Sequence, residues 1–150
     1  MLKIKITDGD PATGLLKFKV NGWPSKEGNG RAKKNAPVRW TFKSGTRVLS
    51  ILDINMKTGN GAPPSTDIFS ADPPTPQTDG SWAATVNQGA TVGEEYNYYI
   101  SWQSAVGPRE HDPKISVMPS SSPFKKLLIG VSTFVGILVT LRFLNKKIKK

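Results

Sequence analysis

Short runs of β-favouring residues, each closed by glycine or proline, fill residues 1–118 and leave no room for a long helix. In the run "LLKFKV", Leu16, Phe18 and Val20 alternate with two lysines, so the apolar side chains share one face of a strand. The run "VRWTF" places Val38 and Trp40 on one face in the same way. No helical period of useful length occurs before residue 124. This pattern predicts an antiparallel β-sandwich of seven or eight short strands over residues 1–118.

The run "EEYNYYISW" is the most aromatic of the expected strands. If Tyr96, Tyr98 and Ile100 face the core, the period of two turns Tyr99 outward together with Asn97. The four tryptophans add large apolar side chains to the same core. These residues predict an aromatic interior of adequate size for one domain.

The end of the chain has a different character. Residues 127–141 carry no charge, a length of about 22 Å as a helix, and residues 127–144 reach about 27 Å if Arg142 directs its charge to the headgroups. Because a bilayer core is about 30 Å thick, we expect a short membrane span. The sequence therefore divides into a sandwich domain (1–118), a joint (119–123), a transmembrane helix (124–144) and a basic tail (145–150). The expected anchor residues are Lys126, Leu127, Leu128, Ile129, Val131, Phe134, Val135, Ile137, Leu138, Val139, Leu141 and Arg142.

Small residues recur at every fourth position of the expected span. Ser132, Gly136 and Thr140 share one helix face, where a second helix can approach closely. The bilayer is thus one expected partner, and self-association through this face is a second.

Charge is unevenly divided along the chain. The formal net charge is +10, but residues 122–150 hold seven Lys or Arg and no acid, so the domain contributes only +3. Phosphate binding needs a basic surface on the folded part, and we therefore do not expect nucleic acid as a partner. The cluster Arg31–Lys34 is read as a solvated loop, with contact to anionic headgroups as the alternative.

Two rules give opposite orientations for the span. Five basic residues follow it and two precede it, which by the positive-inside rule puts the domain outside and the C-terminus in the cytoplasm. The N-terminus, however, alternates apolar and polar residues and does not read as a signal peptide. We expect a single-pass, tail-anchored protein with a cytosol-facing domain, and the outside domain remains the alternative.

No pattern in the sequence points to chemistry. The chain has no cysteine and one histidine, His111, which we expect to lie in a loop without a function. The loop that starts at Asp53 begins like a calcium loop, but Lys57 and Thr58 stand where a ligand and a glycine are needed. We therefore expect no enzyme, no cofactor and no metal.

A resemblance to a known family can be named from four motifs. The run "VRW", a "DG-W" hairpin, "YNYYI" and a closing "DPKISV" together resemble cupredoxin-like and immunoglobulin-like sandwich domains over residues 38–117. The resemblance implies the architecture and not the copper function. A blue-copper site needs two histidines and a cysteine, which this chain lacks.

The resulting functional hypothesis is a membrane-anchored, non-catalytic binding module acting as sensor, adaptor or scaffold. Its protein or small-molecule ligand is expected at the proline-rich segment 59–80, with Ile68, Phe69 and Tyr99 as the candidate recognition patch. Two alternatives remain open. One is a small membrane effector whose clustered spans perturb the bilayer, and the other is a structural protein of the cell envelope.

Overall fold

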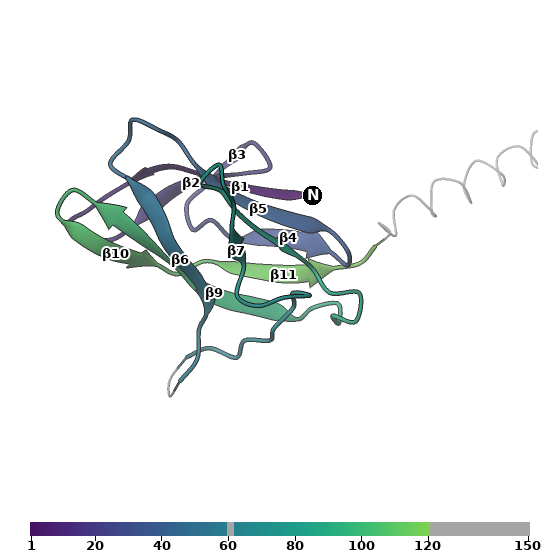
Figure 1. Cartoon of the computed structure of the whole chain (residues 1–150). Coiled ribbons are helices and arrows are strands. Elements are labelled where there is room, and N and C mark those ends of the chain that lie inside the picture. Colours follow the sequence, from purple (N-terminus) through teal and green to yellow (C-terminus); the bar gives the residue numbers. More distant parts are fainter. Residues whose placement is uncertain (60–61, 121–150) are drawn as a thin grey trace, which may run out of the picture. The chain divides into compact units, whose positions relative to one another are not determined.

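The computed structural model describes residues 1–59 and 62–120, drawn in colour in Figure 1. Residues Met1–Met118 form one compact unit. The predicted transmembrane helix, its association face and the basic tail all lie outside the described residues. Within the part that is described, no helix is both long and apolar enough to cross a bilayer.

All regular structure in the described residues is β-strand. The strands are β1 (Leu2–Gly9), β2 (Leu16–Val20), β3 (Trp23–Ser25), β4 (Gly30–Lys33), β5 (Pro37–Phe42), β6 (Ser50–Met56), β7 (Thr75–Pro76), β8 (Trp82–Thr85), β9 (Glu95–Ser104), β10 (Gly107–His111) and β11 (Lys114–Met118). The prediction of an all-β domain is confirmed, with more strands than the seven or eight expected.

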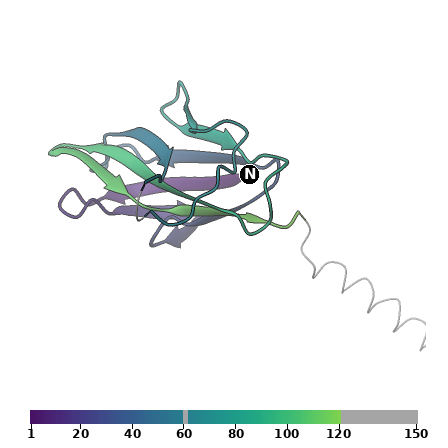
Figure 2. The same cartoon turned by 90° about the horizontal axis from the view of Figure 1, so that it is seen from below.

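Two sheets make up the domain, as the two views of Figures 1 and 2 show. The first sheet has the order β3-β2-β1-β5-β8-β7. The second has the order β10-β9-β11-β4, and β6 also pairs with β9. Because β9 is ten residues long, it accommodates β6 along one edge and β10 and β11 along the other.

The expectation of a purely antiparallel sandwich is wrong in two places. β1 and β5 are parallel, with Leu2 opposite Val38, and β4 and β11 are parallel, with Ile115 opposite Gly30. A parallel pair needs a crossover connection, and here the intervening strands supply it. Both sheets are therefore mixed.

The core lies between the two sheets and follows the predicted alternation. Along β9 buried residues alternate strictly with half-buried ones, so Tyr96 and Tyr98 are inside while Tyr99 is turned outward. Trp40 of the first sheet donates its indole N–H to the Tyr98 hydroxyl of the second at 3.0 Å. This hydrogen bond satisfies two buried polar groups and joins the two layers.

The proline-rich segment closes one part of this core. Ile68 and Phe69 have exposed fractions of 0% and 2%, and the Phe69 ring packs edge-on against Trp40 and Tyr96. The Tyr96 hydroxyl donates to the Asp72 carboxylate at 2.6 Å, which ties the segment to β9. The segment is thus held by aromatic packing and one charged acceptor.

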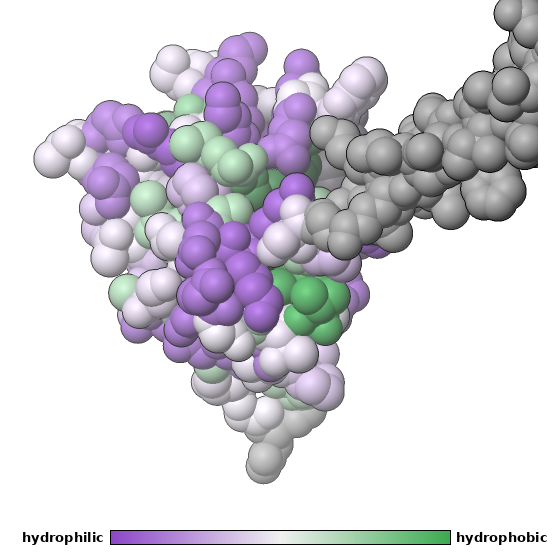
Figure 3. Space-filling model, turned by 90° about the vertical axis from the view of Figure 1, so that its right-hand side faces the viewer, coloured by the Kyte–Doolittle hydropathy of each residue, from purple (hydrophilic) through white to green (hydrophobic). Residues whose placement is uncertain are grey.

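Polar residues cover most of the outside. On the side of the molecule seen in Figure 3, hydrophilic residues dominate and apolar residues form small separate patches. The exposed large apolar residues of the described part are Met1, Leu15, Trp23, Leu49, Leu52, Val92 and Val106, and exposed apolar residues are normal for a protein surface.

Candidate binding site

Lysines occupy the outward positions of the first two strands. β1 and β2 are antiparallel, and Lys5 lies directly opposite Lys19. On the other edge of β1, Lys3 lies opposite Arg39 of β5. Directly paired side chains point to the same face of a sheet, so these four cations stand together on the outer face of the first sheet.

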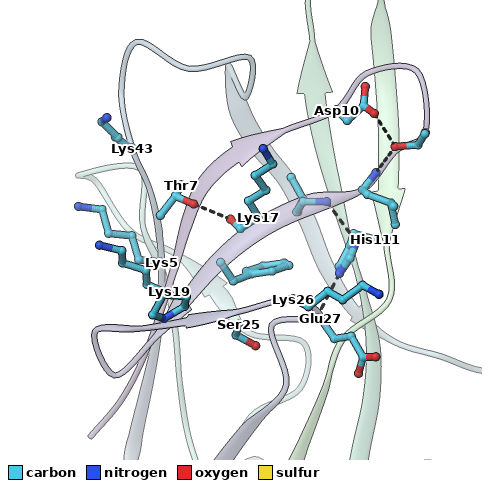
Figure 4. A pocket seen from close by; sticks show the side chains of 15 residues that line it. Lys5, Thr7, Asp10, Lys17, Lys19, Ser25, Lys26, Glu27, Lys43 and His111 are labelled. Atoms are coloured by element: carbon cyan, nitrogen blue, oxygen red, sulfur yellow. Dashed lines mark hydrogen bonds between the residues drawn. The ribbon is translucent and has the colours of Figure 1, made fainter.

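A groove of about 1110 Å³ is lined by lysines of this face and also by the inward-facing Leu16 and Phe18 of β2. Five lysines line it: Lys5 from β1, Lys17 and Lys19 from β2, Lys26 from the loop after β3, and Lys43 from the loop after β5. Figure 4 shows their ammonium groups distributed around the groove, with Lys5 and Lys19 side by side. These five lysines define the lysine groove.

The two carboxylates that line the lysine groove accept hydrogen bonds from groups other than its lysines. Asp10 accepts hydrogen bonds from the Ala12 N–H at 3.0 Å and the Thr13 hydroxyl at 2.9 Å, which holds the β1–β2 turn. These two hydrogen bonds lower the pKa of Asp10, and the bond from the Ala12 N–H has the larger effect. Glu27 accepts from the Asn29 amide at 2.7 Å. Among the described residues, none of the five lysines forms a salt bridge.

A smaller concavity of about 590 Å³ continues the basic surface across β1. It shares Lys5 and Lys19 with the lysine groove and adds Lys3 and Arg39. Arg39 is paired with Asp79 and also donates to the Ser81 hydroxyl at 3.0 Å. Its charge is therefore partly neutralised, in contrast to those of the lysines.

Charge in the domain is strongly polarised. The two concavities collect seven of the fourteen Lys and Arg of the domain and only three of its eleven acids, a local net charge of +4. The rest of the domain holds seven basic residues and eight acids. Summed over its residues, the domain is nearly neutral because the sum averages a basic face with a nearly neutral remainder.

The floor of the lysine groove contains the single histidine. His111 is the last residue of β10, not a loop residue as expected, and only 8% of it is exposed. Its ring packs 4.9 Å from that of Phe18. A Cβ at Gly28 would lie 2.9 Å from the Phe18 ring, so only glycine fits beside it, and the positive φ of +74° also favours glycine here.

Both ring nitrogens of His111 have backbone partners. The Leu16 N–H donates to Nδ1 at 3.2 Å, and Nε2 lies 3.2 Å from the Glu27 carbonyl oxygen. Since Nδ1 accepts, the Nε2 nitrogen carries the proton and donates to Glu27, so the ring is neutral. Burial lowers the pKa of His111, opposed by the hydrogen bond to Glu27 and by the nearby Asp112. The ring links β10 of the second sheet to β2 of the first.

The residues of the predicted recognition patch are not brought together at the surface. Ile68 and Phe69 are core residues, for the packing reason given above, and only Tyr99 reaches the surface in part. Arg31 and Lys33 are exposed, but they belong to β4 rather than to a loop. No cluster of three or more potential metal-ligating side chains occurs in residues 1–59 and 62–120.

Sequence reasoning missed the lysine groove although its signal is local. The runs "LKIKI" and "LKFKV" each place lysines at alternate positions. If the two runs are paired as neighbouring strands, all their lysines fall on one face. The contributions of Lys26 and Lys43 depend on loop conformation and carry no such signal.

No family model matches the chain, and no curated protein matches it. Among solved structures, two of rusticyanin are similar: a methionine-to-leucine variant and the reduced protein. Each is 22% identical to this chain, with a TM-score of 0.32. The two alignments each cover 77% of this chain, and they cover 75% of the variant and 77% of the reduced protein. A likeness of this size supports no conclusion about function. The two-sheet architecture of this chain rests on its own strand pairings.

Proposed function

We propose that this chain is a non-catalytic binding module that holds an anionic ligand in the lysine groove and is attached to a membrane by its C-terminal segment. The observation that carries the proposal is the pairing of Lys5 with Lys19. Like charges directly opposite each other in a sheet destabilise it. An anionic ligand removes that repulsion when it binds, so the folded domain gains most from a negatively charged partner.

The groove fits binding better than catalysis. Its one titrating ring, His111, has both nitrogens committed to backbone partners. The Thr7 hydroxyl donates to the Lys17 carbonyl at 3.1 Å and is likewise engaged. A general base needs a free acceptor within reach of the group that it deprotonates. These contacts therefore support a surface that attracts a ligand without transforming it.

The membrane attachment rests on the uncharged run at 127–141 and on the lysines that flank it. The proposed topology is a single span with the domain facing the cytosol. A binding module with this arrangement gathers its ligand at the membrane surface.

The test is a titration of the full chain, kept in a neutral detergent, with three polyanions: polyphosphate, an oligonucleotide and mixed micelles containing phosphatidylserine. We expect at least one to bind with an affinity that falls steeply with salt. The Lys5→Glu/Lys19→Glu variant should lose this binding.

The matched control is Arg31→Glu/Lys33→Glu, which changes the net charge equally on exposed positions of β4. It should bind like the unaltered chain. If no polyanion binds, or if both variants are weakened to the same degree, the lysine groove is not the binding site.

A further inference from the structure

We propose that the occupant of the lysine groove is the anionic surface of a lipid bilayer. This rests on the proposed function and names the partner of the same site. The groove lysines then hold the domain flat against the headgroups, so that the membrane contacts the folded domain as well as the C-terminal segment.

The identity of the cations favours a diffuse anionic surface. All five cations of the groove are lysines, which are flexible point charges, whereas recognition of single phosphates or base edges typically uses the planar fork of arginine. Arg39, which lies opposite Lys3 on the same face, is held by Asp79. Long lysine stems also allow the chain to lie on headgroups while each ammonium group reaches its own anion.

The aromatic residues of this region are not placed for base stacking. Phe18 is buried beneath the groove, and only 3% of it is exposed. Trp23 is 78% exposed and is paired with Val20 across β2 and β3. The residue before Val20 is Lys19, whose side chain points to the opposite face of β2. Since paired residues share a face, Trp23 lies on the side opposite to Lys19. Single-stranded nucleic acid relies on stacking platforms, which the groove does not offer.

An apolar side chain stands beside the lysines. Leu15 lines the groove and is 58% exposed. Leucine next to clustered lysines is the combination by which peripheral proteins insert into the boundary between headgroups and acyl chains. The lysine charges attract the domain to the anionic headgroups, and the Leu15 side chain is removed from water on contact.

The chain length to the predicted span keeps the domain near a bilayer. Six residue steps separate Met118 from residue 124, which reach at most about 22 Å when fully extended. Electrostatic attraction is screened over about 8 Å at physiological salt. A domain tethered this closely samples contact with the headgroups continually, and each lysine near an anionic surface strengthens the contact about fivefold.

The experiment follows the reactivity of individual lysines by mass spectrometry. The full chain is added to preformed vesicles of phosphatidylcholine alone or with 30 mole percent phosphatidylserine, and an amine-acetylating reagent is applied briefly. We expect Lys5, Lys17 and Lys19 to react several-fold more slowly with the anionic vesicles only. Lys33 and Lys34, outside both concavities, serve as internal references and should react equally with both kinds of vesicle.

Variants connect the protection to the groove. Lys5→Glu/Lys19→Glu, and the milder Lys5→Gln/Lys19→Gln as a safeguard against misfolding, should lose the protection of Lys17. Arg31→Glu/Lys33→Glu should retain it. Circular dichroism establishes that each variant is folded.

The other outcomes each overturn the inference. Equal protection by neutral vesicles means that charge does not drive the contact. The same labelling is repeated with an oligonucleotide and with polyphosphate in place of the vesicles. Protection by the oligonucleotide but not by anionic vesicles assigns the groove to nucleic acid and leaves the proposed function intact. Protection by no polyanion of any kind removes the proposed function as well.

Discussion

At the scale of single residues, the pairing of Lys5 with Lys19 makes a direct prediction about stability. Lys19→Glu replaces repulsion by attraction and should raise the free energy of unfolding by about 0.5–1 kcal/mol. Urea unfolding of the chain in neutral detergent measures the gain, which should shrink at 1 M salt because the charges are exposed. Lys33→Glu is the control, because its cross-strand partner is Met118. A destabilised Lys19→Glu variant would contradict the assigned register.

His111 gives a prediction about pH. Its pKa is lowered in the folded chain by burial, so the unfolded chain binds more protons below about pH 6.5. Stability should therefore be constant above that pH and fall as the pH drops from about 6.5 towards the lowered folded pKa. His111→Gln keeps one acceptor and one donor but does not titrate, and should remove the slope between pH 6.5 and 5.5. An unchanged slope in this variant would assign the effect to another group.

The buried position of this histidine could not have been predicted from its neighbours. The chain around His111 reads as a turn, because Pro113 follows closely and charged residues flank it. Its partners, Leu16 and Glu27, lie 95 and 84 positions away in the sequence. Contacts of that range depend on the completed fold and leave no local pattern.

At the scale of elements, the hydrogen bond from Trp40 to Tyr98 is one of the contacts that join β9 to the first sheet. Tyr98→Phe leaves the buried Trp40 N–H without its acceptor and should cost about 1–3 kcal/mol of stability. Thermal or urea unfolding measures the loss. Tyr99→Phe, the adjacent outward position, is the control and should change stability by less than about 0.5 kcal/mol. Similar losses in the two variants would mean that the Trp40 bond contributes little.

Which face each strand residue takes was predictable, and which strand lies beside which was not. The period of two correctly placed Leu16, Phe18, Val38 and Trp40 inside, because side-chain direction is a local property of an extended chain. The parallel pairs β1–β5 and β4–β11 were missed because sequence proximity favours antiparallel hairpins. Ile68 and Phe69 are expected in the recognition patch because they lie in a long segment without predicted regular structure. Packing against Trp40 and Tyr96 overrides that local signal.

At the scale of the whole molecule, the division into a domain and a predicted anchor leads to a fractionation experiment. The full chain should remain with membranes after a carbonate wash, whereas a chain ending at residue 123 should be released. Immunoblotting of the pellet and supernatant distinguishes the two. Release of the full chain by carbonate would mean that the predicted span is wrong. The lysine groove would still have to be tested separately. Protease digestion of sealed membranes then reports on which side the domain lies.

The parallel pair between β4 and β11 also has a consequence for folding kinetics. Ile115 pairs with Gly30, 85 positions earlier, and β11 lies between β9 and β4 in the second sheet. Loop closure over such a distance is slow, and topologies rich in distant pairings fold in milliseconds to seconds. Until β11 arrives, the edges of β4 and β9 are open to other chains. Misassembly should therefore depend most on the time before the last strand is inserted.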